Sequence, residues 1–415
     1  MISYEKFALD NGLRVLVHED PSTPMAAINI LYDVGARDEN ESRTGFAHLF
    51  EHLMFEGSLN IASYDPPLQL AGGSNNAFTS NDITNYYLTL PATNLETGFW
   101  LESDRMLELA FLQEKLDVQK KVVIEEFKQR YLNQPYGDLW LLMRPLVYER
   151  HPYLWPTIGK EIRHIEEATL IDVRSFFFSY YAPNNAILTV AGGVKTEEVK
   201  LLAEKWFGPV PKRDVPVRNL PEEPEQTKEK RLSVERDVPS DAIMMAFHMG
   251  RRTDPDYPAC DLASDILSGG KSSRLYEKLV KQRPVFTEIG CYVMGSVDPG
   301  LIVIFGKLDK HYTIRDGEEA IWGVLEELKN EPIPEKELEK VKNKLETNEK
   351  FSMMNVLNIA MKLGYAELLG DADLVNKDLD LYRKVTTEEV QQAARKAFVK
   401  TNCSVLEYHA QPKSL

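Results

Sequence analysis

The feature that most constrains the fold is a proline- and charge-rich segment in the middle of the chain, residues 208–231 (GPVPKRDVPVRNLPEEPEQTKEKR). Proline interrupts helices and central strands, so this composition is typical of a linker. A stretch of this length without regular structure is uncommon inside a compact domain, and 415 residues are enough for two domains. We therefore predict domains at residues 1–210 and 232–415, joined by a linker at 211–231.

The two predicted domains repeat one another's pattern. DAIMMAFHMG (241–250) is similar to AAINILYDVG (26–35), and both are predicted strands. KVTTEEVQQAARKAFVKTNCSVLEY (384–408) is similar to EEATLIDVRSFFFSYYAPNNAILTV (166–190), a T-x-x-x-V helix followed by a closing strand. Strands mixed with runs of helix predict an α+β fold with two homologous domains, each a mixed β-sheet covered by helices.

Local patterns predict several elements of the first domain. The Asn11-Gly12 pair predicts the turn of a β-hairpin between two alternating segments. Apolar residues at helical spacing predict a helix over residues 44–55. Further strands are predicted at 85–91 and 186–193.

Charge and apolar content exclude some classes of protein. The net charge of −15 makes nucleic acid a poor partner, because an acidic surface repels phosphate backbones. No window approaches 18 apolar residues, so no membrane span is predicted. The three cysteines form no C-x-x-C pair, and the N-terminal residues lack the pattern of a signal peptide. We expect a cytoplasmic protein, with a periplasmic or organellar mature form left open.

The stretch HLFEH places His48 and His52 four residues apart on the predicted helix. Two side chains at this spacing leave the same helix face, and a pair of imidazoles can supply two ligands to one zinc ion. Glu51 lies beside His52, where it can accept a proton from a metal-bound water. The arrangement is the inverted zincin motif H-x-x-E-H.

A catalytic zinc site needs a third protein ligand, which must come from elsewhere in the chain. The predicted helix KKVVIEEFK offers Glu125 and Glu126. Glu126 follows Val122 and Val123 by four and three positions and so shares their apolar face, whereas Glu125 lies on a wetter flank. We predict Glu126 as the ligand and one zinc ion per chain. A purely structural zinc site is the weaker alternative, because such sites often use cysteine and no cysteine lies near the histidines in sequence.

HLFEH followed by VVIEEF resembles the pitrilysin/insulinase family of inverted-motif zinc peptidases, over nearly the whole chain. The short chain is similar to the branch that includes the mitochondrial processing peptidase and its bacterial relatives. The resemblance implies two such subunits closing like a clamshell around an unfolded peptide. It also implies that His48, His52 and Glu126 bind zinc and that Glu51 is the general base.

Residues 72–87, GGSNNAFTSNDITNYY, resemble the substrate-binding strand of that family. An exposed edge strand can pair with an extended peptide through main-chain hydrogen bonds, so binding depends little on the side chains of that peptide. We expect Asn76, Ala77, Phe78 and Thr79 to be the pairing residues. The physiological substrate and the cleavage preference cannot be read from such a strand.

Two positions depart from the family pattern. Gln119 stands where many relatives carry an acidic residue seven positions before the glutamate ligand. In the second domain, Arg283 matches an arginine that binds the substrate carbonyl, but Thr287 stands where its partner tyrosine is expected. The missing phenol implies a homologous partner subunit with an intact arginine–tyrosine pair. A heterodimer is therefore expected, and a homodimer stays open.

These residues together favour a zinc metalloendopeptidase subunit that hydrolyses peptides or unfolded polypeptides inside a closed chamber, as the zinc-bearing half of a heterodimer. The alternative is a non-catalytic assembly or scaffold subunit of the same fold. Such relatives typically have broken zinc motifs, whereas all four motif residues are present in this chain. Thr287 is the one feature that favours the scaffold alternative.

Overall fold

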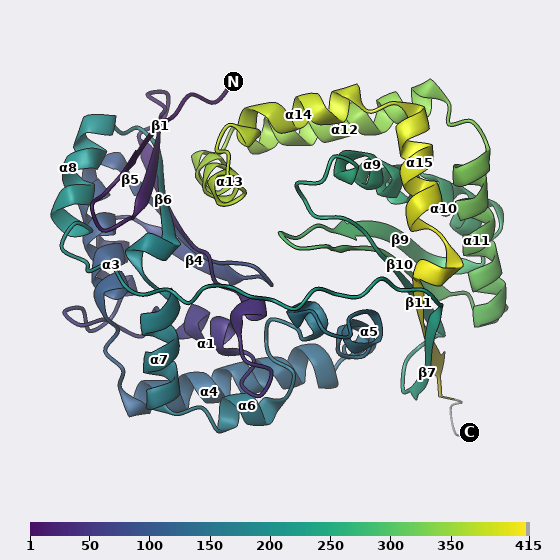
Figure 1. The fold of residues 1–415 in the computed structure, drawn as a ribbon, viewed down its shortest axis with the longest axis horizontal. Coiled ribbons are helices and arrows are strands. Elements are labelled where there is room, and N and C mark those ends of the chain that lie inside the picture. The colour runs from purple at the N-terminus through teal and green to yellow at the C-terminus, as the bar shows by residue number, and fades with distance from the viewer. Residues whose placement is uncertain (412–415) are drawn as a thin grey trace. The chain divides into compact units, whose positions relative to one another are not determined.

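The computed structural model describes residues 1–411, which form two compact units. The first unit contains Met1–Arg130, His151–Pro221 and Lys350–Lys377. The second contains Tyr131–Arg150, Glu222–Glu349 and the chain from Asp378 onward. Each unit is a mixed β-sheet covered by helices (Figure 1), which confirms the predicted α+β class and the two-domain organisation.

The sheet of the first unit has six strands in the order β1-β2-β6-β3-β5-β4. The pair β2 and β6 is parallel, and the other neighbours are antiparallel. The predicted hairpin and the predicted strands are present, because their alternating residues place one side on the core. The strands are β1 (Glu5–Ala8), β2 (Arg14–Glu19), β3 (Met25–Tyr32), β4 (Ser74–Thr79), β5 (Thr84–Pro91) and β6 (Ala186–Gly192).

Helices from the N-terminal half and one from the C-terminal half pack in this unit. They are α1 (Phe46–Leu53), α2 (Asp65–Leu70), α3 (Leu95–Leu107), α4 (Gln113–Phe127), α6 (Ile162–Glu166), α7 (Leu170–Tyr180), α8 (Thr196–Trp206) and α13 (Val356–Leu368). A π-helical turn, Lys128–Leu132, follows α4 directly. None of the helices described within residues 1–411 combines the length and apolar character needed to cross a membrane.

Helix α13 lies on the sheet of the first unit although it follows most of the second unit in sequence. Ala360 of this helix packs on Ala27 and Ala191 of the sheet. At Gly364 an added Cβ would lie 3.2 Å from Asn29 Nδ2, so small residues let the helix approach closely. The compact units therefore exchange segments, whereas the predicted boundaries at 210 and 231 divide the chain by sequence and remain a proposal for where the homologous halves meet.

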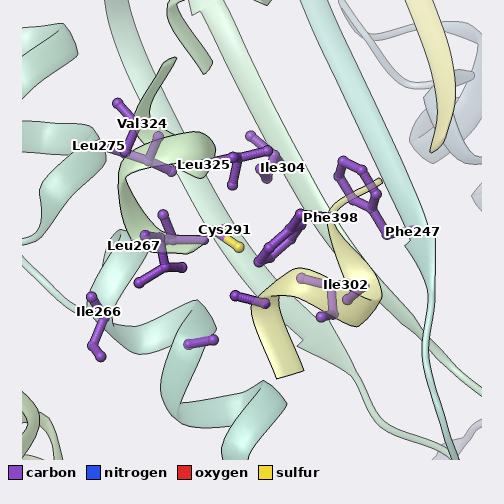
Figure 2. Packing of buried hydrophobic residues seen from close by; sticks show 14 of the residues in the cluster. Phe247, Ile266, Leu267, Leu275, Cys291, Ile302, Ile304, Val324, Leu325 and Phe398 are labelled. Atoms are coloured by element: carbon purple, nitrogen blue, oxygen red, sulfur yellow. The ribbon is translucent and has the colours of Figure 1, made fainter. Parts of the chain in front are cut away.

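The second unit is built on five strands in the order β7-β11-β8-β10-β9. These are β7 (Lys230–Arg236), β8 (Ala242–His248), β9 (Phe286–Met294), β10 (Leu301–Leu308) and β11 (Cys403–Ala410). Its helices are α5 (Leu139–Val147), α9 (Tyr257–Ser268), α10 (Arg274–Tyr276), α11 (Ile314–Asn330), α12 (Glu335–Ser352), α14 (Leu374–Lys384) and α15 (Thr387–Ala397), of which α12 and α14 cross the unit boundaries. In the core, the Phe247 and Phe398 rings meet edge to face at 5.1 Å, near the free thiol of Cys291 (Figure 2).

Hydrogen bonds and an ion pair attach the N-terminal end of the proline-rich segment to the first unit. Arg213 donates to the backbone oxygens of Tyr181, Met106 and Leu107, at 2.6, 3.0 and 2.6 Å. Arg218 forms an ion pair with Asp38 at 2.7 Å. Residues 211–229 lack helix and strand, as the composition predicts, and β7 begins at Lys230. The guanidinium groups of Arg213 and Arg218 bind backbone oxygens and carboxylates of the first unit.

Candidate metal centre

Helix α1 carries His48, Glu51 and His52, and its start depends on a glycine. Gly45 has φ of 90° and precedes the helix in the left-handed conformation. A Cβ at this position would lie 2.6 Å from the backbone oxygen of Ile158. Glycine is therefore required for the turn that directs the helix and its two histidines.

A buried carboxylate from an earlier loop caps the N-terminus of α1. Glu39 Oε2 accepts a hydrogen bond from the Gly45 N–H, and Oε1 accepts one from the Ala47 N–H, both at 2.8 Å. Gly45 has no side chain to provide this cap, so Glu39 pairs two of the free N–H groups of the helix end. Burial raises the pKa of Glu39 to about 8, and the two hydrogen bonds act in the opposite direction.

This capping carboxylate predicts a pH-dependent stability. Between pH values of about 4.5 and 8, folded Glu39 retains a proton that the unfolded chain releases. The unfolded state then binds fewer protons, so the free energy of unfolding should fall as pH rises through this window. Urea denaturation of wild type and Glu39→Gln across the window measures this, and the wild-type curve should have the steeper decline. Parallel pH profiles for the two proteins would contradict the expectation.

The predicted third ligand lies beside the two histidines. Glu126 Oε2 is 3.7 Å from His48 Nε2 and 3.5 Å from His52 Nε2. One ligand atom from each residue can be chosen so that all lie within 4.8 Å of one another. In a tetrahedral zinc site with bonds of about 2.0–2.1 Å, neighbouring ligand atoms lie roughly 3.3–3.4 Å apart. The three side chains therefore fit a zinc ion, and within residues 1–411 they are the one such group of histidine, cysteine and acidic side chains.

The charges of these side chains suit a metal ligand set. Burial lowers the pKa of His48, so its imidazole is neutral and keeps a lone pair for a metal. A hydrogen bond from His52 lowers the pKa of Glu126, which keeps that carboxylate ionised. Two histidines and one glutamate form the donor set of many catalytic zinc sites.

Glu51 is held from the edge strand. Its Oε2 accepts a hydrogen bond of 2.7 Å from the hydroxyl of Thr79, the last residue of β4. Burial raises the pKa of Glu51, and the Thr79 hydrogen bond opposes this shift. The carboxyl is thus positioned beside the ligand set, with Oε1 left to exchange a proton.

The predicted pairing residues all lie on β4, at the edge of the sheet. Asn76, Ala77, Phe78 and Thr79 pair with β5 on one side, from Asn76↔Tyr87 to Thr79↔Thr84. The order of strands leaves the other side of β4 without a neighbouring strand among the described residues. This geometry is what addition of an extended peptide requires.

The side chains of the two adjacent glutamates of α4, Glu125 and Glu126, have different partners and different exposure. The Glu125 side chain is 61% exposed and forms an ion pair with Lys128 at 2.7 Å. The Glu126 side chain is 19% exposed and faces the histidines. The prediction rested on Val122 and Val123: Val123 is buried as expected, whereas Val122 is 42% exposed, so only the spacing to Val123 agrees with the direction of Glu126.

Sequence reasoning missed two side chains that support this region, Glu39 and Glu56, and it missed the contact of Thr79 with Glu51. Glu39 caps α1, the Thr79 hydroxyl holds Glu51, and Glu56 accepts a hydrogen bond from Gln119. Gln119 therefore lies next to a carboxylate from outside its own helix. Nothing in the spacing of Glu39 or Glu56 marks either role, since both lie outside α1.

Arg283 lies in the second unit, on an exposed stretch just before β9. Its guanidinium carbon is 5.7 Å from the centre of the Tyr312 ring. Thr287 uses its hydroxyl to donate to the backbone oxygen of Lys307 at 3.2 Å. The role predicted for Arg283 remains a proposal.

Comparison with known proteins gives matches over most of the chain. The family model described as "Insulinase (Peptidase family M16)" matches residues 14–136, and "Peptidase M16 inactive domain" matches residues 167–345. The zinc protease PqqE of Helicobacter pylori is 30% identical over 345 residues, which cover 82% of this chain and 78% of that protein. The mitochondrial-processing peptidase subunit beta of Saccharomyces cerevisiae is 28% identical over 60% of this chain and 54% of its own length. A crystal structure of a protease from Helicobacter pylori matches with a TM-score of 0.94 and 26% identity, covering 99% of this chain and all of that one.

Proposed function

Because this chain belongs to the insulinase family of M16 peptidases, we propose that it is the zinc-bearing subunit of a metalloendopeptidase that hydrolyses peptides or unfolded polypeptides. The observation that carries this proposal is the meeting of Glu126 with His48 and His52, at 3.7 and 3.5 Å. Glu51 stands beside this set and is held in place by Thr79. Relatives named zinc proteases support zinc as the metal.

In this proposal His48, His52 and Glu126 would hold the metal. The bound ion supplies Lewis acidity, which makes water a better nucleophile near neutral pH. Glu51 takes the proton of the attacking water at Oε1, because its Oε2 accepts the Thr79 hydroxyl. The same carboxyl then gives the proton to the departing amine.

The open side of β4 is the proposed substrate site. A peptide added along Asn76–Thr79 would extend the sheet and would bring its main chain next to Glu51, through Thr79. Pairing of this kind reads main-chain groups, so it suits unfolded segments of varied sequence. Arg283 is proposed as a further contact to substrate, from the second unit.

A homologous subunit is the proposed partner. Thr287 stands where a tyrosine is expected beside the substrate arginine, so a second chain with an intact arginine–tyrosine pair would supply the missing phenol. The yeast relative is itself named as a subunit, which supports an assembly of unlike chains. A homodimer is the alternative, and the size of the purified protein alone and with its partner distinguishes the two.

The proposed compartment is the cytoplasm. All three cysteines, Cys260, Cys291 and Cys403, are buried and free. Reduced thiols agree with a reducing compartment, since secreted proteins more often pair their cysteines.

An assembly subunit without catalysis is the second candidate, and Thr287 is the observation that favours it. A scaffold has no need of stoichiometric zinc or of an ordered Glu51. Metal analysis of the purified chain therefore separates the two candidates before any substrate is known.

Chelation provides the test of the proposed function. The purified protein, alone and with its partner subunit, should cleave an unfolded reporter polypeptide. A chelator should remove that cleavage, and added zinc should restore it, because the proposed chemistry needs the metal. Cleavage that survives complete removal of metal would overturn the proposal.

A further inference from the structure

Arg130 lies one turn beyond Glu126, in the π-helical turn that follows α4. Its Nη1 is 3.0 Å from Glu126 Oε1. The other oxygen of the same carboxylate, Oε2, is the one that faces His48 and His52. π-Helical turns are rare and occur frequently at functional sites, where they redirect the side chains that follow.

We infer that Arg130 is a positioning residue that holds the Glu126 carboxylate so that it offers a single oxygen to the metal. The inference rests on the proposed function, since it concerns the same zinc site. The guanidinium holds Oε1 by a charge-assisted contact, which leaves Oε2 directed at the two histidines. A carboxylate bound through one oxygen keeps a coordination position available for solvent and substrate.

Because Arg130 is exposed, its effect on the orientation of Glu126 can be measured apart from any effect on the stability of the fold. The Arg130 side chain is 68% exposed and that of Glu126 is 19% exposed. An ion pair whose arginine is this exposed contributes little to the free energy of unfolding. Loss of the Arg130 guanidinium should therefore leave the fold intact and change the orientation of the ligand.

The sign of the effect on metal binding distinguishes this role from general electrostatics. Removing a positive charge near a cation site should strengthen cation binding, if only Coulomb repulsion matters. Removing a guanidinium that orients a ligand should weaken it, because partners of ligand side chains typically contribute 10- to 100-fold in metal affinity. The two explanations thus predict opposite changes.

Lys128 provides a matched control on the same turn. It forms an ion pair with Glu125 at 2.7 Å rather than with Glu126, and its side chain is 42% exposed. Lys128→Met removes the same charge as Arg130→Met, from a position two residues away. Arg130→Lys keeps the charge but lacks the planar fork that holds a carboxylate oxygen.

The experiment is a zinc titration of the metal-free full-length chain against a competing chelator, with thermal unfolding recorded in parallel. We expect Arg130→Met to bind zinc about 10-fold more weakly than wild type, at unchanged stability of the metal-free protein. Lys128→Met should bind as tightly as wild type or more tightly, and Arg130→Lys should be intermediate.

Equal zinc affinity of wild type and Arg130→Met would overturn the inference while leaving the proposed metal centre standing. Equal weakening by Arg130→Met and Lys128→Met would also overturn it, because a general effect of charge or of the turn would explain both. Failure of the wild-type chain to bind zinc would overturn the proposed centre itself, and this inference with it.

Discussion

Peptide cleavage should fall about a thousand-fold when Glu51 is replaced by glutamine, while one zinc ion stays bound per chain. Glutamine has the shape of glutamate and can still accept the Thr79 hydrogen bond that now reaches Oε2. It cannot take a proton from water, so both proton transfers are lost. The measurement is kcat on a reporter peptide, together with zinc content by elemental analysis.

A neighbouring glutamate provides the control for this substitution. Glu125 lies in the same region, but its carboxylate is exposed and pairs with Lys128. Glu125→Gln should leave both the rate and the zinc content unchanged. If Glu51→Gln kept the wild-type rate, Glu51 would not be the general base, and the assembly-subunit candidate or another base would have to be considered.

Loss of the Glu126 carboxylate should remove zinc from the purified protein. Binding of structural zinc by four protein ligands amounts to about 10–16 kcal/mol, so one ligand corresponds to roughly 2.5–4 kcal/mol. Glu126→Ala should therefore lower zinc affinity by roughly 100- to 1,000-fold. The measurement is a competition titration with a chelator of known affinity, and cleavage should be lost at the same time.

Glu125, the residue next to Glu126, provides a control for this substitution within the same helix turn. Glu125→Ala removes a carboxylate of the same type, one position away, that faces solvent. Its zinc affinity should match wild type, because its side chain does not face His48 or His52. Zinc binding that survives in Glu126→Ala but is lost in Glu125→Ala would reverse the assignment of the third ligand.

Local spacing predicted much of the site before any tertiary contact was known. His48, Glu51 and His52 lie within one helical turn, so their common face follows from helix geometry alone. The hairpin at Asn11-Gly12 also follows from turn residues and alternation, whereas the edge strand at residues 74–79 was expected from the resemblance of residues 72–87 to the family's substrate strand. The direction of Glu126 agrees with the buried Val123 three positions before it, whereas Val122, four positions before it, is exposed.

The sequence by itself determined the class of fold, the two-part organisation and the residues of the candidate metal centre, because these depend on periodicities within a few residues. Only the tertiary structure decided that α13 returns to the first sheet, that Glu39 caps α1, and that Arg130 and Thr79 each hold one oxygen of a neighbouring carboxylate. Such contacts depend on which faces pack together and on where side chains point after packing. Spacing along the chain carries no information about either, since contacts between distant residues are selected by burial and by the pairing of polar groups across the whole unit.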